Sequence, residues 1–248
     1  MDGFSEMMNG GGRTSSCSGI ALARVTSITD PKDMGRVKCA YISADKDLGE
    51  TGWIHCMTPF GGKECGFFFH PNVEDIVVLA YEDGDIHRPF VLGSLWVSKA
   101  KPPLAVKGGK NQQYRLSTPN KSFLEFGDED KKEKITVSTP KGREMVLDDE
   151  KKLISVSDGK NKLTMKEDGG TVELACDKKL VIKVGSGVTI TCDGTSGSVE
   201  IKTNKEITLS SAQIKAKASG TAQIEGSGSV TVKSSGAMTI KGSMTSIN

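Results

Sequence analysis

Cysteine and histidine side chains gather in one stretch of the sequence, where they could bind a metal ion. Cys56 and Cys65 flank a short loop, and His55 and His70 lie beside them. Thiolates and imidazoles are the usual ligands of zinc, but their spacing here fits no standard zinc motif, and none of the six cysteines forms a CxxC pair. We therefore expect free, mostly buried thiols, with no metal site and no cofactor.

Groups that could carry out acid–base or nucleophilic catalysis are distributed unevenly along the chain. All three histidines precede residue 98, and residues 127–248 contain no His, Phe, Tyr or Trp. The enzymatic alternative, a monomeric β-solenoid such as a polysaccharide lyase, needs acid and base residues in a groove and often rings that stack on sugars. The histidines of the first part belong to no recognisable catalytic motif. We therefore expect no catalytic residues and no enzymatic activity.

Charge also separates the two parts of the chain. Residues 1–98 have a net charge of −5, whereas the remainder has +7, spread as single lysines between acidic residues. A nucleic-acid surface needs a basic groove with interleaved aromatic rings. Phe67, Phe68 and Phe69 have no Lys or Arg between them, so we interpret them as barrel core plus an apolar contact surface. No nucleic-acid partner is expected.

The elements that would position these residues are short strands. After a Gly/Ser-rich tail at residues 1–17, β-rich runs cover residues 19–25, 36–42, 52–57, 66–71, 75–81 and 89–96, separated by turn signals and without helical periodicity. Five or six short strands within residues 18–98 predict a small closed barrel. The oligonucleotide/oligosaccharide-binding (OB) topology fits this strand number best.

Motif residues recur in a fixed order through this region, beginning with Asp30-Pro31 and Gly35-Arg36 and ending with Gly84-Asp85, Arg88-Pro89 and Gly93. This ordered set resembles the OB domain of phage baseplate assembly protein V, which is shared with the valine–glycine repeat (VgrG-like) spikes of type VI secretion. Glu74 departs from the family, which usually has a Gly at this position. The resemblance implies a fold of an OB barrel followed by a trimeric β-helix. The motif residues are Asp30, Pro31, Gly35, Arg36, Gly84, Asp85, Arg88, Pro89 and Gly93, together with Gly52-Trp53, Asp75-Ile76-Val77-Val78 and Ser94-Leu95.

A Pro- and Gly-punctuated linker at residues 99–113 leads into a repetitive region at residues 114–248. Two or three alternating apolar residues and a small polar turn recur there, as in Ile135/Val137, Val199/Ile201 and Val230/Val232. The repeat shortens from eleven residues to eight toward the C-terminus, which is typical of a β-solenoid. The predicted fold class is therefore all-β, with an N-terminal OB barrel and a C-terminal triple-stranded β-helix.

Three intertwined chains would explain why this region lacks aromatic residues. Each strand buries only two or three aliphatic side chains, which does not offset the entropy of ordering it alone. In a homotrimer the apolar residues would meet on a narrow shared axis, and every strand would pair with neighbours from the other chains. The axis positions expected near the C-terminus are Leu209, Ala216, Ile224, Val232 and Ile240.

By resemblance, the chain is expected to be the structural central spike of a contractile injection system, such as a phage tail, a tailocin or an extracellular injection particle. It would dock on a separate baseplate hub through its barrel and pierce the target envelope, touching membrane only transiently. The C-terminal end, with Met244, Ile247 and Asn248, would bind a tip protein of the proline-alanine-alanine-arginine (PAAR) repeat kind. The sequence shows neither a signal peptide nor a membrane span, so assembly in the cytoplasm is expected. A trimeric fibre or adhesin that binds a surface ligand is the alternative.

Overall fold

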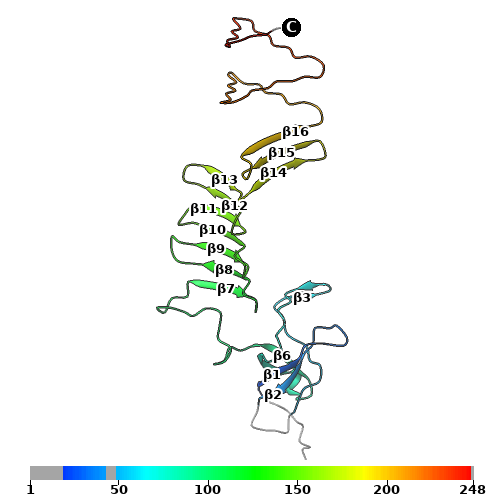
Figure 1. Ribbon diagram of the computed structural model, residues 1–248. Helices are drawn as coiled ribbons and strands as arrows, with labels where there is room; N and C mark the ends of the chain where they lie inside the picture. The colour runs from blue at the N-terminus through cyan, green and yellow to red at the C-terminus, as the bar shows by residue number, and fades with distance from the viewer. Residues whose placement is uncertain (1–18, 43–48, 247–248) are drawn as a thin grey trace, which may run out of the picture. The chain divides into compact units, whose positions relative to one another are not determined.

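The computed structural model describes residues 19–42 and 49–246 (Figure 1). These residues form an all-β structure, as predicted, in which one turn of 3₁₀ helix at Glu82–Gly84 is the sole helical element described. The chain divides into two compact units, Met1–Cys176 and Asp177–Asn248. Each unit is described by itself.

The N-terminal barrel is built on four antiparallel strands in the order β2-β1-β5-β6. The segment at residues 50–57 closes it, because Ile54 bridges antiparallel to Val37 of β2 while Cys56 bridges parallel to Val91 of β6. One parallel contact between the third and fifth strands is what a five-stranded OB barrel requires. The strands are β1 (Ala21–Ser27), β2 (Lys38–Tyr41), β5 (Ile76–Tyr81) and β6 (Pro89–Ser94).

The barrel core consists of small aliphatic side chains that alternate along these strands. Every strand faces inward with one or two residues and outward with the next, which is the period-two pattern of a half-buried strand. The rings of the domain are therefore left at its periphery. The buried residues are Ala23, Val25, Val37, Cys39, Ile54, Val77, Leu79 and Val91.

A small hairpin leaves the barrel after residue 57, formed by β3 (Gly61–Gly62) and β4 (Cys65–Gly66). The strand predicted at residues 66–71 is wrong, since strand structure ends at Gly66 and residues 67–71 run without ladder pairing. The prediction that the adjoining phenylalanines form barrel core plus an apolar contact surface is wrong in its first part, because all three are exposed. Small aliphatic residues already fill the narrow barrel, so the rings remain outside.

The repetitive region begins with a seven-stranded antiparallel sheet in which each strand pairs with its neighbours in the sequence (Figure 1). The strands alternate apolar and polar residues, which is the period-two pattern of a sheet with one apolar face. Left-handed residues such as Lys121, Lys131 and Gly142 reverse the chain between them. The strands are β7 (Gln113–Ser117), β8 (Phe123–Gly127), β9 (Lys134–Ser138), β10 (Glu144–Asp148), β11 (Leu153–Ser157), β12 (Lys162–Lys166) and β13 (Thr171–Ala175).

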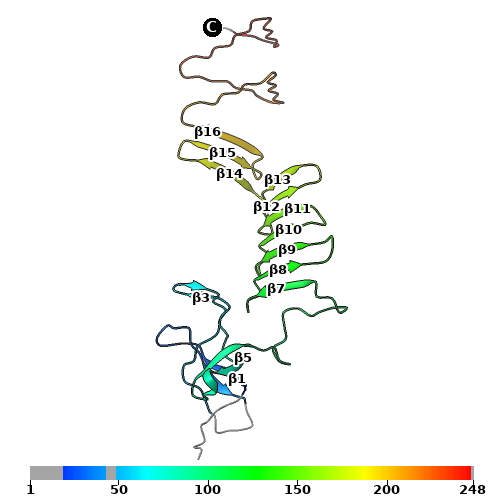
Figure 2. The same ribbon diagram turned by 180° about the vertical axis from the view of Figure 1, so that it is seen from behind.

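The second unit begins with a three-stranded antiparallel sheet of β14 (Lys179–Val184), β15 (Val188–Asp193) and β16 (Ser198–Thr203). After β16 the chain runs to and fro in further passes that carry no strand assignment (Figure 2).

β7, β13, β14 and β16 are edge strands with one ladder each among the described residues, whereas β8 to β12 and β15 pair along both edges. The expectation that every strand of this region pairs with other chains is therefore wrong for β8 to β12 and β15. Their ladders lie within one chain. The physical reason is the short turn between successive paired strands, because closing a loop of three to six residues costs less entropy than recruiting a partner chain.

Candidate functional site

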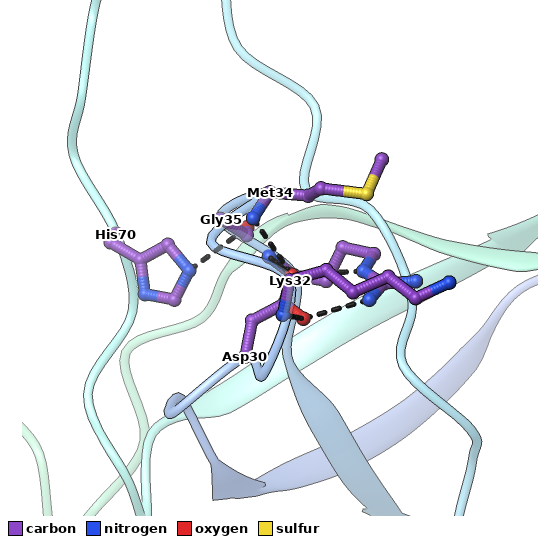
Figure 3. A network of polar contacts seen from close by, with 6 residues as sticks. Asp30, Lys32, Met34, Gly35 and His70 are labelled. Carbon is purple, nitrogen blue, oxygen red and sulfur yellow. Dashed lines mark hydrogen bonds and ion pairs between the residues drawn. The ribbon is translucent and has the colours of Figure 1, made fainter.

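A carboxylate clamp fixes the connection between β1 and β2 (Figure 3). Asp30, whose side chain is 3% exposed, accepts two hydrogen bonds from the Arg36 guanidinium, at 2.7 Å to Oδ1 and 2.9 Å to Oδ2. The backbone N–H groups of Lys32 and Met34 each donate to the same carboxylate at 3.0 Å. The Arg36 pair holds the pKa of Asp30 well below its usual range, and the backbone donors act in the same direction.

The clamp explains why four of the predicted motif residues occur together. Pro31 lies at the head of the turn and Gly35 has a left-handed φ of 65°, so the chain can curl around the carboxylate. The Arg36 backbone N–H lies 3.4 Å from Asp30 Oδ2. Each of these four residues therefore helps to hold the loop between β1 and β2 in one conformation, and their role is structural.

His70 connects the loop around Asp30 to the segment at residues 67–69, which we call the aromatic segment (Figure 3). Sequence reasoning missed this contact. Its Nε2 lies 3.1 Å from the Gly35 carbonyl oxygen and its Nδ1 lies 3.1 Å from that of Pro71. The ring also stacks on Phe68 at 5.7 Å between centroids. The aromatic segment is thus held against the clamp loop.

Phe60 joins the phenylalanines of this segment in an exposed aromatic patch, which we define as Phe60, Phe67, Phe68 and Phe69. Phe68 is the most exposed, at 81%, and Phe67 stacks on Phe69 at 5.9 Å. Phe67 N donates to Phe60 O at 2.9 Å. Several exposed rings gathered in one short segment are unusual for a monomeric protein and typical of an interface.

Gly66 allows the two strands of the hairpin to come close together beside Phe60. A Cβ added at this position would lie 2.5 Å from the Phe60 carbonyl oxygen, and its φ of 139° disfavours other residues. The Thr58 hydroxyl donates to the Phe67 carbonyl at 2.8 Å, which further fixes the base of the hairpin. The patch is therefore a structured surface with its backbone hydrogen-bonded.

The second set of motif residues builds the turn between β5 and β6. Asp85 N donates to Glu82 O at 2.9 Å and Arg88 N donates to Asp85 O at 2.9 Å. The Arg88 guanidinium lies 2.6 Å from Glu82. Gly84 has φ 73°, and Pro89 is the first residue of β6. Gly93 lies further along β6, opposite Val78 and next to a bulge in the ladder.

The seven-stranded sheet presents one apolar face. Each strand places two apolar side chains on it, and the antiparallel register aligns them in two continuous rows. Eleven of these side chains are more than 40% exposed. We call this surface the apolar face. Its rows are Tyr114, Phe126, Ile135, Leu147, Ile154, Met165 and Val172, and Leu116, Leu124, Val137, Met145, Val156, Leu163 and Leu174.

The opposite face of the same sheet is mostly polar, and its larger apolar side chains are Phe123, Val146 and Leu153. Thr136, Ser155 and Thr164 lie along its middle, and ion pairs such as Arg115–Glu125 and Lys134–Asp148 flank them. Ser155 and Thr164 are nevertheless buried between their longer neighbours. Because the polar face packs closely while the apolar face is open, the apolar face is the side that lacks a cover.

The three-stranded sheet has a comparable alternation. Its register aligns Leu180 with Cys192 and Val199, and Ile182 with Ile190 and Ile201. The expected axis positions Leu209, Ala216, Ile224, Val232 and Ile240 all follow this sheet and are exposed. The structure brings none of them into contact with a core. Of the expected tip residues, Met244 is exposed, and Ile247 and Asn248 lie outside the described residues.

The thiols of the barrel are poor nucleophiles and poor metal ligands. Burial raises the pKa of Cys39 to about 12 and that of Cys56 to about 11, so both are protonated at neutral pH. Among residues 19–42 and 49–246, no three Cys, His, Asp or Glu side chains group as a metal site would require. Within the same residues, no helix has the length and apolarity to cross a membrane.

Comparison with known families identifies the barrel. Residues 21–96 match the family described as the type VI secretion system/phage-baseplate injector OB domain. No curated protein matches the chain. The match confirms the predicted resemblance over the barrel, including the clamp and the β5–β6 turn, and it supports a structural role in a baseplate-type assembly.

Proposed function

We propose that this protein is the central spike of a contractile injection system, which docks on a baseplate hub through its barrel and pierces the target envelope. One observation carries the proposal. An injector-type OB barrel is followed in the same chain by short repeated strands whose apolar side is uncovered. The proposed role is mechanical, and we propose no catalytic function.

The apolar face supports a homotrimer. Two rows of aliphatic and aromatic side chains along seven strands are far more apolar surface than a soluble monomer usually exposes. Three copies of one sheet can enclose such faces around a common axis, and identical chains supply rows of matching length and spacing. The polar faces would then point outward, which suits their serines, threonines and ion pairs.

The aromatic patch supports a docking site for the hub. It lies on the barrel, the part of the chain that matches the injector family, and the carboxylate clamp braces it through His70. Central aromatic anchors contribute most of the free energy of typical interfaces. At the other end, we propose that a PAAR-like tip protein covers Met244, Ile247 and Asn248. Ile247→Asp should abolish capture of such a protein, whereas capture at wild-type level would contradict this contact.

The family match suggests a phage-tail-like assembly, and we propose that the spike is assembled in the cytoplasm as part of such a particle. The first test is the mass of the purified full chain, by light scattering coupled to size-exclusion chromatography. A mass near three times 26.4 kDa is expected. A folded monomer would contradict the trimer and with it the spike.

Hub docking is tested by incorporation into particles. Phe68→Ser should reduce the amount of spike that co-purifies with injector particles, because the ring is exposed in the free chain and contributes little to its folding. Val106→Ser is the matched control, an exposed apolar residue of the linker outside the patch. Equal incorporation of both variants would exclude the patch as the docking site.

A further inference from the structure

The turns of the seven-stranded sheet form two rows, one at each end of its strands. Successive strands run antiparallel, so consecutive turns alternate between the two ends. The turns after β8, β10 and β12 lie at one end, and those after β7, β9 and β11 lie at the other. We call the first set the acidic row, which is residues 128–133, 149–152 and 167–170, and the second set the basic row, which is residues 118–122, 139–143 and 158–161.

The two rows carry opposite net charge. The acidic row holds eight acidic and four basic residues, a net charge of −4, whereas the basic row holds four basic residues and one acidic residue, a net charge of +3. All of these charged residues are exposed. Two lysines of the acidic row are paired inside it, at 2.9 Å for Lys132–Glu129 and 3.2 Å for Lys152–Asp168. The charge that the acidic row offers a partner is therefore mostly negative.

These complementary charges cannot meet within one chain. The strands between the rows are five residues long, which separates the two rows by about 16 Å. Exposed charges more than about 10 Å apart are largely screened at ordinary ionic strength. A protein group that neutralises either row from the other side must therefore belong to another molecule.

The neighbouring sheet shows that charged turns are not a general property of this chain. The turn between β14 and β15, residues 185–187, is Gly-Ser-Gly, and the turn between β15 and β16, residues 194–197, is Gly-Thr-Ser-Gly. Neither turn carries a charge. Small polar residues are therefore sufficient to reverse the chain, and the charges of the seven-stranded sheet call for another explanation.

We propose that the acidic row of each chain binds the basic row of the next copy, and that this contact sets the direction and the axial register of the chains. The inference rests on the trimer of the proposed function and adds to it which surfaces meet where two sheets adjoin. Cyclic symmetry brings one end of every sheet against the opposite end of its neighbour, so unlike rows meet at all three lines of contact. A neighbour that ran antiparallel would bring like rows together, which is unfavourable.

The spacing of the turns supplies the register. Turns of one row are two strands apart, which is about 10 Å, and the two rows are offset by one strand. Rotation about the trimer axis keeps each turn at its own height when the strands lie across that axis. The turn at residues 139–143, with Lys141 and Arg143, then lies between the turns 128–133 and 149–152 of the neighbouring chain. A slip by one strand would set turn against turn.

A second copy suits these rows better than a lipid surface or an unrelated protein. An identical sheet presents turns of opposite charge at the same spacing along the whole row. A lipid surface with anionic headgroups would attract the basic row alone and would repel the acidic row. The pair of rows is therefore explained by one partner, whereas other partners explain one row at most.

Zero-length cross-linking of the wild-type full chain tests the contact directly. A carbodiimide condenses a lysine amine with a carboxylate that it touches and takes up the water as a urea. In trimers assembled from isotope-labelled and unlabelled chains, Lys141 should be joined to acidic residues of 128–133 or 149–152 in peptide pairs that carry one label each. The Lys132–Glu129 pair is the internal positive control.

The same experiment separates this inference from the proposed function. If the protein is a trimer by mass and the cross-links remain within each row, or join a row to a different molecule, the contact between rows is wrong and the proposed function is untouched. A monomeric mass would overturn both.

Charge reversal gives a second measurement with a matched control. Lys141→Glu combined with Arg143→Glu should lower the trimer association constant about tenfold at low salt, because like charges then face one another, and the loss should shrink as salt is added. Lys99→Glu combined with Lys101→Glu is the control, since it makes the same change of charge on exposed linker residues outside the rows. Equal association constants for the two variants in sedimentation equilibrium at low salt would overturn the proposal.

Reversal of the facing charges distinguishes a contact between chains from a disturbed turn. Asp128→Lys and Asp130→Lys, added to the variant with Lys141→Glu and Arg143→Glu, exchange the charges of the two turns. Association should then return to within about threefold of wild type, as it does for coupled residues in contact. These turns lie at opposite ends of the strands in one chain, so the recovery reports a contact between chains. Association that remains as weak as before would show that the turns do not meet.

Discussion

Val172→Asp tests whether the apolar face is an interface between chains. Val172 lies on β13 and is 70% exposed in the single chain. Full burial of a valine side chain contributes about 1.5–3 kcal/mol, so covering the exposed part contributes about 1–2 kcal/mol per chain. Three copies give about 3–6 kcal/mol, which is roughly a hundredfold to ten-thousandfold in the trimer association constant. Three carboxylates brought together out of water add to this loss.

Thr171→Asp is the matched control. Thr171 is the neighbouring residue on the same strand, it points to the polar face, and its partner in the register is Lys166. Both variants place an aspartate in β13 and incur a similar strand-propensity cost. The difference between the association constants of the two variants therefore reports which face of the sheet is buried between chains.

The assay is sedimentation equilibrium over a dilution series, with far-ultraviolet circular dichroism to confirm that each variant is folded. Val172→Asp should dissociate at concentrations where wild type and Thr171→Asp remain trimeric. If both variants have the wild-type association constant, the apolar face is not the interface and the argument from its exposure fails.

Two further predictions concern the barrel. Glu74 has a left-handed φ of 75°, so Glu74→Gly should stabilise the barrel by about 1 kcal/mol, offset slightly by the exposed Arg24–Glu74 contact at 3.4 Å; an unchanged or lower thermal midpoint would contradict this. Asp30→Asn should lower the denaturant midpoint at neutral pH. Because folding depresses the Asp30 pKa, the carboxylate's contribution is complete above the ordinary value of 3.8 and is lost as the pH falls through the lower folded value. The gap between Asp30→Asn and wild type should therefore be constant at neutral pH and shrink below about pH 4; a gap independent of pH would show that the charge is irrelevant.

The barrel could be predicted from the sequence because its signals are local. Alternation over four to seven residues and turn residues such as Asp30-Pro31 and Gly84-Asp85 fix each strand and corner in place. The structure adds a reason for the family's preference for glycine at the position of Glu74, since the backbone there is left-handed. The contact between His70 and Gly35 spans 35 residues, and no local pattern signals it.

The pairing partner of each later strand could not be predicted in the same way. Alternation specifies which side chains share a face, and the same hydrogen bonds form whether the neighbouring strand belongs to one chain or to another. The turn lengths were the available signal, because the short connections after β8 to β12 favour immediate hairpins. For Phe67 to Phe69, three consecutive rings resembled a buried strand, but the core had already been filled by Val25, Val37 and their neighbours.

The sequential pairing of β7 to β13 also constrains how such proteins can change in length during evolution. Each strand contacts only its neighbours in the chain, so duplication or loss of a unit leaves the ends of the sheet unaltered. Successive strands run in opposite directions, however. If a single strand were added, the last strand would end at the opposite edge of the sheet from the one where the chain now continues. Natural variants of this region should therefore differ by even numbers of strands, in steps of about 10 Å per added pair.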